Sequence, residues 1–191
     1  PLVQEHDPKE PLRVWIPGCA TGEEAYSIVI LLLEEMARAS KNTTLQVFAS
    51  DIDREALKRA RQGIYPGTIS VDISPERLAT FFIKQNGTYQ VDQRVRDCLT
   101  FAEHNLILDP PFMRLDLVSC RNLLIYLQPL AQKKVLSLIH FALERKSVLL
   151  LGPAYKKGTS DWRESPSVHV AERLAASGAV VQFCDPYIPE V

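Results

Sequence analysis

The fold of this chain is decided by residues 12–53, LRVWIPGCATGEEAYSIVILLLEEMARASKNTTLQVFASDID. The apolar runs Leu12–Ile16 and Leu45–Ala49 predict two strands. Between them, the apolar spacing from Glu23 onward predicts a helix, which follows a turn of small residues. A strand–helix–strand unit of this kind implies two parallel strands joined by a right-handed crossover.

The turn before the predicted helix carries G-x-x-x-G, from Gly18 to Gly22, rather than the G-x-G-x-x-G of dinucleotide sites. Glu23 and Glu24 then open the helix, where two carboxylates repel a pyrophosphate and attract a cation or an amine. Asp51 ends the second strand and is placed to bind a ribose diol. We therefore expect a nucleoside ligand without phosphates, such as S-adenosylmethionine. The alternative is that the two glutamates only favour the helix dipole.

Composition places the chain among ordinary globular proteins. It has 191 residues, 46% of them hydrophobic and 24% charged, and a net charge of −1, which gives no electrostatic case for nucleic acid. No apolar run approaches the roughly 20 residues of a membrane span, and no signal peptide is visible. The four cysteines and four histidines are scattered. We therefore expect neither a metal site nor a disulfide framework, no membrane partner, and a cytoplasmic protein.

Strands and helices alternate along the rest of the chain, after a polar lead-in at residues 1–10 that we expect to be loose. Helices are predicted at residues 53–61, 74–82, 129–143 and 166–176, and strands at 99–102, 115–119, 147–151 and 180–184. Asn86-Gly87 predicts a hairpin. The pattern predicts one doubly wound α/β domain with a mainly parallel, Rossmann-like sheet.

Five motifs occur in order: PGCATGEEAYS, FASDID, GIYP, FAEHNLILDPPF and LDLVSCRNLLIYL. With them the chain closely resembles, over about residues 11–143, the CheR-type protein-glutamate methyltransferases of chemotaxis. The resemblance implies S-adenosylmethionine as cofactor, S-adenosylhomocysteine as product, and a chemoreceptor-like protein as substrate. Residues 64–99 occupy the place of the family's small β-subdomain, which can dock a receptor tether. Here the pattern predicts a helix and one hairpin instead.

The resemblance also implies the site residues. The cofactor-binding positions are Gly18, Ala20, Thr21, Glu23, Asp51 and Asn105. Arg121 and Tyr126 match residues that face the site of methyl transfer. Two alternatives stay open: an ion pair of Arg121 with Asp116 or Glu103, and packing of Tyr126 in the core with its hydroxyl exposed.

The chemistry agrees with this assignment. A glutamate carboxylate is ionised near pH 7 and attacks a sulfonium methyl without a general base. The enzyme must align the two groups and exclude water, which is positioning work. Arg121 can hold a carboxylate by a charge-assisted pair, and Tyr126 can donate a further hydrogen bond.

The tail resembles a different family. Residues 146–189 carry the motifs GPAYK, TSDWRESP and GAVVQFCDP, and they resemble the C-terminal domain of UDP-glucose and related UDP-sugar 6-dehydrogenases. There, Lys156 would match a substrate-side lysine and Arg163 an arginine near the cofactor. Because the dehydrogenase's other parts do not precede it, we expect the tail to be structural.

We therefore interpret the chain as a chimera: a lead-in (1–10), a methyltransferase-like part (11–145) and a dehydrogenase-like βαβ unit (146–191) that completes the same sheet. An engineered join near residues 144–154, a natural fusion and a divergent family member stay open as its origin.

Three functions follow from this interpretation. The first is a CheR-type methyltransferase domain. The second is a scaffold that binds S-adenosylmethionine or S-adenosylhomocysteine with little catalysis, because the family's N-terminal helical domain is not in the sequence and the tail replaces its last strands. The third is a UDP-sugar or dinucleotide binder through the tail. The sequence leaves the oligomeric state open.

Overall fold

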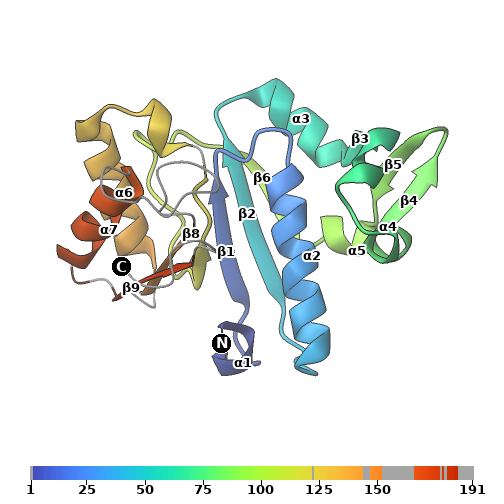
Figure 1. The fold of residues 1–191 in the computed structure, drawn as a ribbon, viewed down its shortest axis with the longest axis horizontal. Helices are drawn as coiled ribbons and strands as arrows, with labels where there is room; N and C mark the ends of the chain where they lie inside the picture. The colour runs from blue at the N-terminus through green and yellow to red at the C-terminus, as the bar shows by residue number, and fades with distance from the viewer. Residues whose placement is uncertain are drawn as a thin grey trace.

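The computed structural model describes residues 2–121, 123–143, 147–151, 166–176, 178 and 180–184. Its central sheet has four parallel strands in the order β6-β2-β1-β7 (Figure 1). These strands are β1 (Leu12–Pro17), β2 (Leu45–Asp51), β6 (Leu99–Glu103) and β7 (Leu117–Val118). The chain builds the sheet to one side of β1 and then returns to its other side, as in doubly wound folds. The predicted mainly parallel α/β sheet is confirmed.

Helices cover both faces of this sheet. Successive side chains of β1 point to opposite faces, so each face presents apolar side chains that a helix can bury. The helices of this part are α2 (Glu23–Arg38), α3 (Arg54–Gln62) and α6 (Pro129–Ala142). Val14 and Ile16 belong to the apolar core that includes α2. Trp15, fully buried between them, belongs to a second core that includes Val135 of α6. The alternation places β1 at the centre of the domain.

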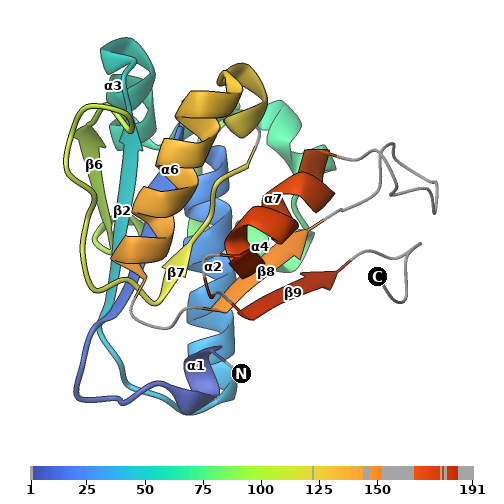
Figure 2. The same ribbon diagram turned by 90° about the vertical axis from the view of Figure 1, so that its left-hand side faces the viewer.

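The tail forms a parallel βαβ unit, with β8 (Ser147–Leu151), α7 (Pro166–Ala176) and β9 (Val180–Cys184) within the predicted ranges. Leu174 of α7 packs against Leu136 of α6, and the two helices lie side by side in Figure 2. Within the described ranges, β8 pairs with β9, while a single parallel bridge joins Leu115 to Leu143. Completion of the main sheet by this unit stays a prediction.

A small antiparallel sheet lies beside α2 and α3, in the strand order β3-β5-β4 (Figure 1). Its elements are β3 (Ile64–Pro66), η1 (Gly67–Val71), α4 (Pro75–Phe81), β4 (Phe82–Gln85), β5 (Thr88–Val91) and α5 (Gln93–Arg96). The predicted hairpin is confirmed, with Asn86 and Gly87 at positive φ. The structure adds a strand that the pattern did not predict, because β3 pairs with β5 and extends the hairpin to a three-stranded sheet. Pro66 is tolerated because β3 is an edge strand.

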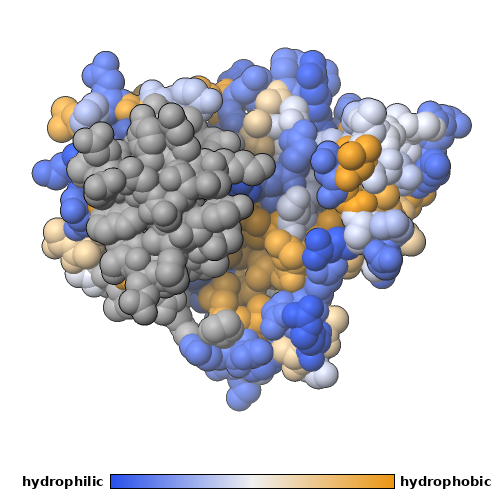
Figure 3. Space-filling view, viewed as in Figure 1, coloured by the Kyte–Doolittle hydropathy of each residue, from blue (hydrophilic) through white to orange (hydrophobic). Residues whose placement is uncertain are grey.

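The N-terminal segment differs from the expected loose lead-in. Residues Leu2–Glu5 form a short helix, α1, with Val3 and His6 buried. His6 Nε2 lies 3.4 Å from the Asp116 carboxylate, which ties the segment to the start of β7. Polar side chains cover its outer surface, at the bottom of Figure 3. Among the helices that the structure describes, none has the length and apolarity needed to cross a membrane.

Candidate functional site

The turn between β1 and α2 is tied by its backbone to the end of β2. The amides of Gly18 and Cys19 both donate to the Ser50 carbonyl oxygen, at 2.7 and 3.1 Å. Gly18, Ala20 and Gly22 adopt positive φ angles of 71°, 46° and 92°. The turn therefore curls over the carboxyl edge of the sheet, where parallel α/β proteins bind ligands.

Asp51 is fixed beside this turn. Its Oδ2 accepts a hydrogen bond from the Ala20 amide at 2.8 Å, and its Oδ1 accepts one from the Asp53 amide at 2.9 Å. Each carboxylate oxygen keeps a second lone pair, which can accept a hydrogen bond from a ribose hydroxyl. The structure thus brings Ala20 and Asp51 together and orients the carboxylate.

Thr21 and Glu23 lie on the outer side of the same turn. The Thr21 hydroxyl donates to the Glu23 carboxylate, at 2.8 Å to Oε1 and 2.7 Å to Oε2, and Glu23 is exposed. The Thr21 carbonyl accepts from the Tyr65 hydroxyl at 2.9 Å. Burial raises the pKa of Tyr65, so this hydroxyl remains a donor. These contacts direct Glu23 back onto its own turn.

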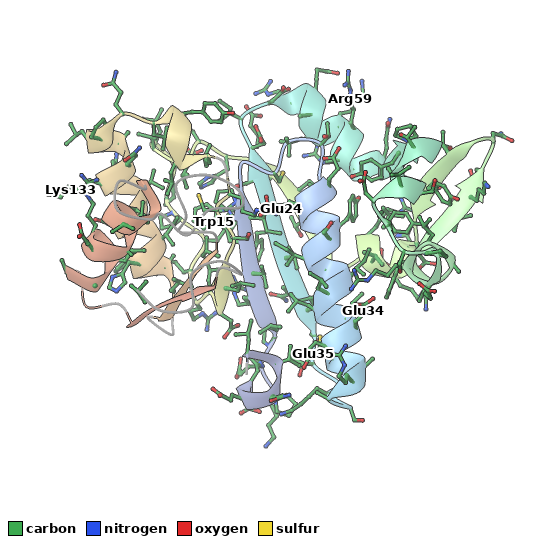
Figure 4. All side chains as sticks on the ribbon, in the orientation of Figure 1. Trp15, Glu24, Glu34, Glu35, Arg59 and Lys133 are labelled. Carbon is green, nitrogen blue, oxygen red and sulfur yellow. The ribbon has the colours of Figure 1, made fainter. Side chains whose placement is uncertain are left out.

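Glu24, one of the two acids that the sequence places at the helix start, is not among the cofactor-binding positions that the resemblance implies. Figure 4 shows it at the start of α2, close to β1. It is half-buried, and its Oε1 accepts a hydrogen bond from the Ser119 hydroxyl at 2.6 Å. Ser119 directly follows β7, so Glu24 lies where the strand order reverses between β1 and β7. The sequence shows two acids at the helix start, but nothing in it distinguishes the inward one from the outward one.

Asn105 follows β6 and organises the next loop. Its side-chain oxygen accepts from the amides of Ile107 and Leu108, at 3.0 and 3.2 Å. The preceding residue, His104, donates its amide to the Asp51 carbonyl at 3.0 Å. Asn105 is therefore placed one residue beyond a direct contact with the end of β2.

Arg121 and Tyr126 lie on the other side of the turn, in the segment after β7. Arg121 is exposed, and Tyr126 is 79% exposed on the short helix η2 (Leu124–Tyr126). Leu123 between them packs against Gly18, where an added Cβ would lie 3.3 Å from it. The structure thus places both predicted catalytic residues on a segment that touches the turn between β1 and α2.

The structure answers the two alternatives for this segment. Asp116 lies against His6, and Glu103 pairs with Arg54, so neither acid forms an ion pair with Arg121 within the part of the chain that the structure describes. A ring that is 79% exposed is not packed in the core, which answers the alternative for Tyr126.

Carboxylates dominate the electrostatics of this edge. Burial, together with the Asp51 charge, raises the pKa of Cys19 to about 12. Burial, together with the Glu24 charge, raises the pKa of Cys120 to about 12. Both thiols are therefore neutral at pH 7 and poor nucleophiles. The negative charges of Asp51 and Glu24 favour a cationic or amine-bearing ligand at this edge and disfavour a phosphate.

Two further predictions concern the tail and metals. Lys156 and Arg163 lie outside the described residues, and their roles stay predictions. Across the ranges that the structure does describe, no group of three His, Cys, Asp or Glu side chains is arranged to hold a metal ion.

Comparisons with known proteins agree with this geometry. Residues 1–163 match the family described as CheR methyltransferase, SAM binding domain. Residues 149–191 match the UDP-glucose/GDP-mannose dehydrogenase family, UDP binding domain, so the two matches share residues 149–163.

Three relatives illustrate the first match. An uncharacterized 104.1 kDa protein of Rhodobacter capsulatus is 41% identical over 80% of this chain and 16% of its own length. A putative methyltransferase, Cher3, of Pseudomonas putida is 39% identical over 74% of this chain and 53% of its own. A chemotaxis protein methyltransferase of Salmonella typhimurium is 34% identical over 71% and 49%, respectively. The chain thus spans about half, or less, of these relatives. Because the family match covers most of its residues, the chain belongs to the CheR methyltransferases and contains their S-adenosylmethionine-binding domain.

Proposed function

We propose that this chain binds S-adenosylmethionine at the carboxyl edge of β1, β2 and β7, and that it serves methyl transfer to glutamate side chains of a chemoreceptor-like protein. The observation that carries the proposal is the Asp51 carboxylate, held by the Ala20 amide within a turn flanked by Glu24. This arrangement suits a nucleoside with a cationic side chain.

In this proposal, Asp51 and Glu24 bind different parts of the cofactor. Asp51 is positioned to accept hydrogen bonds from the ribose hydroxyls. The Oε1 of Glu24 accepts a hydrogen bond from the Ser119 hydroxyl, and its Oε2 can accept one from the ammonium group of the cofactor. Gly18 allows the positive φ with which the turn curls over the edge of the sheet. The resemblance assigns Asn105 to the adenosine side of the cofactor.

Methyl transfer needs alignment more than acid–base help. The cofactor supplies an electrophilic methyl group on a sulfonium. Arg121 holds the incoming glutamate carboxylate by a charge-assisted pair, and Tyr126 donates a further hydrogen bond. Both side chains are exposed beside the turn, so a protein substrate can reach them. The neutral thiols of Cys19 and Cys120 do not compete for the methyl group.

Titration calorimetry with S-adenosylhomocysteine tests the binding step. We expect Asp51→Ala and Glu24→Gln each to weaken binding at least tenfold, because each loses charged hydrogen bonds to the ligand. Glu35→Gln, an exchange on the same helix as Glu24 but near its other end (Figure 4), should bind like wild type. Circular dichroism checks that the variants fold. Wild-type protein that fails to bind would overturn the proposal.

A second candidate is a binding scaffold with little catalysis. The observation that favours it is the dehydrogenase-type match at residues 149–191, which supports a chimera of two Rossmann-like parts. A methyl-transfer assay on a receptor fragment separates the two candidates. Wild-type protein that binds S-adenosylhomocysteine but transfers no methyl group supports the scaffold. Transfer that is lost in Arg121→Ala supports the methyltransferase.

A further inference from the structure

A cavity of about 350 Å³ is lined by residues of α2, α3, α5 and β6 together with Asp97, and none of them belongs to the turn between β1 and α2. Its polar lining consists of Arg61, Gln93, Arg96, Asp97 and Thr100. The cavity shares none of the residues that we assign to cofactor binding or methyl transfer.

Neither arginine of this cavity is paired with a carboxylate in the contacts of the described residues. Arg61 donates from Nη2 to the Phe101 carbonyl at 2.9 Å, and Arg96 donates from Nη2 to the Gln93 side-chain oxygen. The Arg96 Nε is buried, with no hydrogen-bond partner among the residues that the structure describes. Because the Arg96 Nε is buried, an incoming acceptor would bind the terminal nitrogens of the two guanidinium groups, whose charge no carboxylate of the described residues pairs with directly.

Other arginines of the domain are paired differently. Arg54, Arg77 and Arg94 each donate to a carboxylate, at 2.6 to 2.9 Å. Arg61 and Arg96 both lie in the last turn of their helices, α3 and α5, where a basic residue complements the helix dipole.

One acid also lines the cavity. Asp97 accepts a hydrogen bond from the Gln93 amide, whose oxygen in turn accepts from Arg96. Gln93 therefore stands between Asp97 and Arg96 and orients the guanidinium. Two arginines against one aspartate leave the cavity with a net positive charge, opposite to the acidic cofactor edge.

We propose that this cavity binds an oxyanion, specifically a phosphate group, with Arg61 and Arg96 as its charged donors and Thr100 as a neutral one. Guanidinium groups match the geometry of phosphate oxygens and stay charged at all physiological pH values. The volume exceeds that of a phosphate ion, so the cavity has room for part of a molecule that carries the phosphate.

Calorimetric titration with inorganic phosphate, at ionic strength held constant with sodium chloride, tests the proposal. We expect saturable binding to wild type and at least tenfold weaker binding to Arg61→Gln and to Arg96→Gln. Arg59→Gln is the matched control, because Arg59 is an exposed arginine of α3 outside the lining (Figure 4). A parallel titration with O-phospho-L-serine shows whether the natural ligand is free phosphate or a phosphorylated side chain. Tighter binding than phosphate assigns the site to phosphorylated side chains, and equal binding assigns it to free phosphate.

Two results would overturn the proposal: no saturable binding to wild type, or an equal loss in Arg59→Gln. S-adenosylhomocysteine binding serves as the check on folding and should stay unchanged in all three variants. Arg96→Lys keeps the charge but loses the planar fork, and should bind with intermediate affinity. Failure of the cofactor proposal would show in the wild-type titration with S-adenosylhomocysteine and would leave the phosphate result standing.

Discussion

At the end of β2, the Asp51 carboxylate accepts hydrogen bonds from two backbone amides. Its replacement therefore changes the turn between β1 and α2 as well as the charge. Asp51→Asn keeps only one acceptor oxygen, and we expect a loss of about 1–3 kcal/mol in the free energy of unfolding. Asp53→Ala is the matched control, because Asp53 caps α3 and its loss costs about 1 kcal/mol. Urea denaturation measures both losses, and only Asp51→Asn should weaken S-adenosylhomocysteine binding. Equal affinity in the two variants would contradict a ligand role for Asp51.

Cys19 gives the domain a pH-dependent stability. Burial, with the Asp51 charge, raises its pKa to about 12, while an unfolded thiol titrates at about 8.5. Above pH 8.5 the unfolded state binds fewer protons than the folded state, so stability falls as pH rises. Between pH 7.5 and 9.5, ionisation of Cys19 in the unfolded state should lower the free energy of unfolding by about 1 kcal/mol. The stability difference between wild type and Cys19→Ala should shrink by that amount, while the difference for Ser27→Ala, which does not titrate, stays constant.

Among the site residues, the sequence could identify the types better than their roles. Asp51 and the glycine turn follow from the strand ends, because a parallel sheet brings those ends to one edge. The choice between Glu23 and Glu24 depends on where Ser119 lies, and that residue is 95 positions away from Glu24. Local spacing carries no information about such a contact.

At the scale of elements, the turn before α2 depends on Gly22. Its φ is 92°, and an added Cβ would lie 3.0 Å from the Ala60 Cβ of α3. Gly22→Ala therefore combines backbone strain with a steric contact, and we expect a loss of about 2–3 kcal/mol in stability together with weaker cofactor binding. Gly87→Ala has a φ of 79° and nothing within 4 Å of the added Cβ, so it should show the smaller cost of strain alone. Thermal unfolding compares the two, and equal losses would contradict the close approach of α3.

Elements with strong local patterns could be predicted closely, while those made by long-range contacts could not. Helices α3 and α4 begin where the sequence predicts, and Asp53 and Ser74 cap them there, because a cap is a local hydrogen bond. The three-residue strand β3 has no periodic pattern of its own and exists by pairing with β5. Residues 115–119 predicted a strand of five residues, but only Leu117 and Val118 form the ladder with β1.

At the scale of the whole molecule, the tail and the methyltransferase-like part meet through α6 and α7. Leu136 and Leu174 are both buried at this contact, and Leu124, Val170 and Val181 pack around them. A shared apolar cluster of this kind couples two segments into one cooperative unit when it is large enough to bind them together. Two sequences of different ancestry can share a core in this way, because hydrophobic pattern and volume count for more than specific identities.

Leu174→Ala tests this coupling. Removal of a buried leucine should cost about 2–5 kcal/mol. In a Trp162→Phe background, fluorescence reports Trp15, which lies in the core between β1 and α6 rather than in the tail. If the two parts fold as one unit, Leu174→Ala lowers the urea midpoint of the Trp15 signal by the full stability loss. Leu130→Ala, on α6 but 82% exposed, should leave that midpoint unchanged. An unchanged urea midpoint of the Trp15 signal in Leu174→Ala would show that the tail unfolds independently and that the main sheet is stable without it.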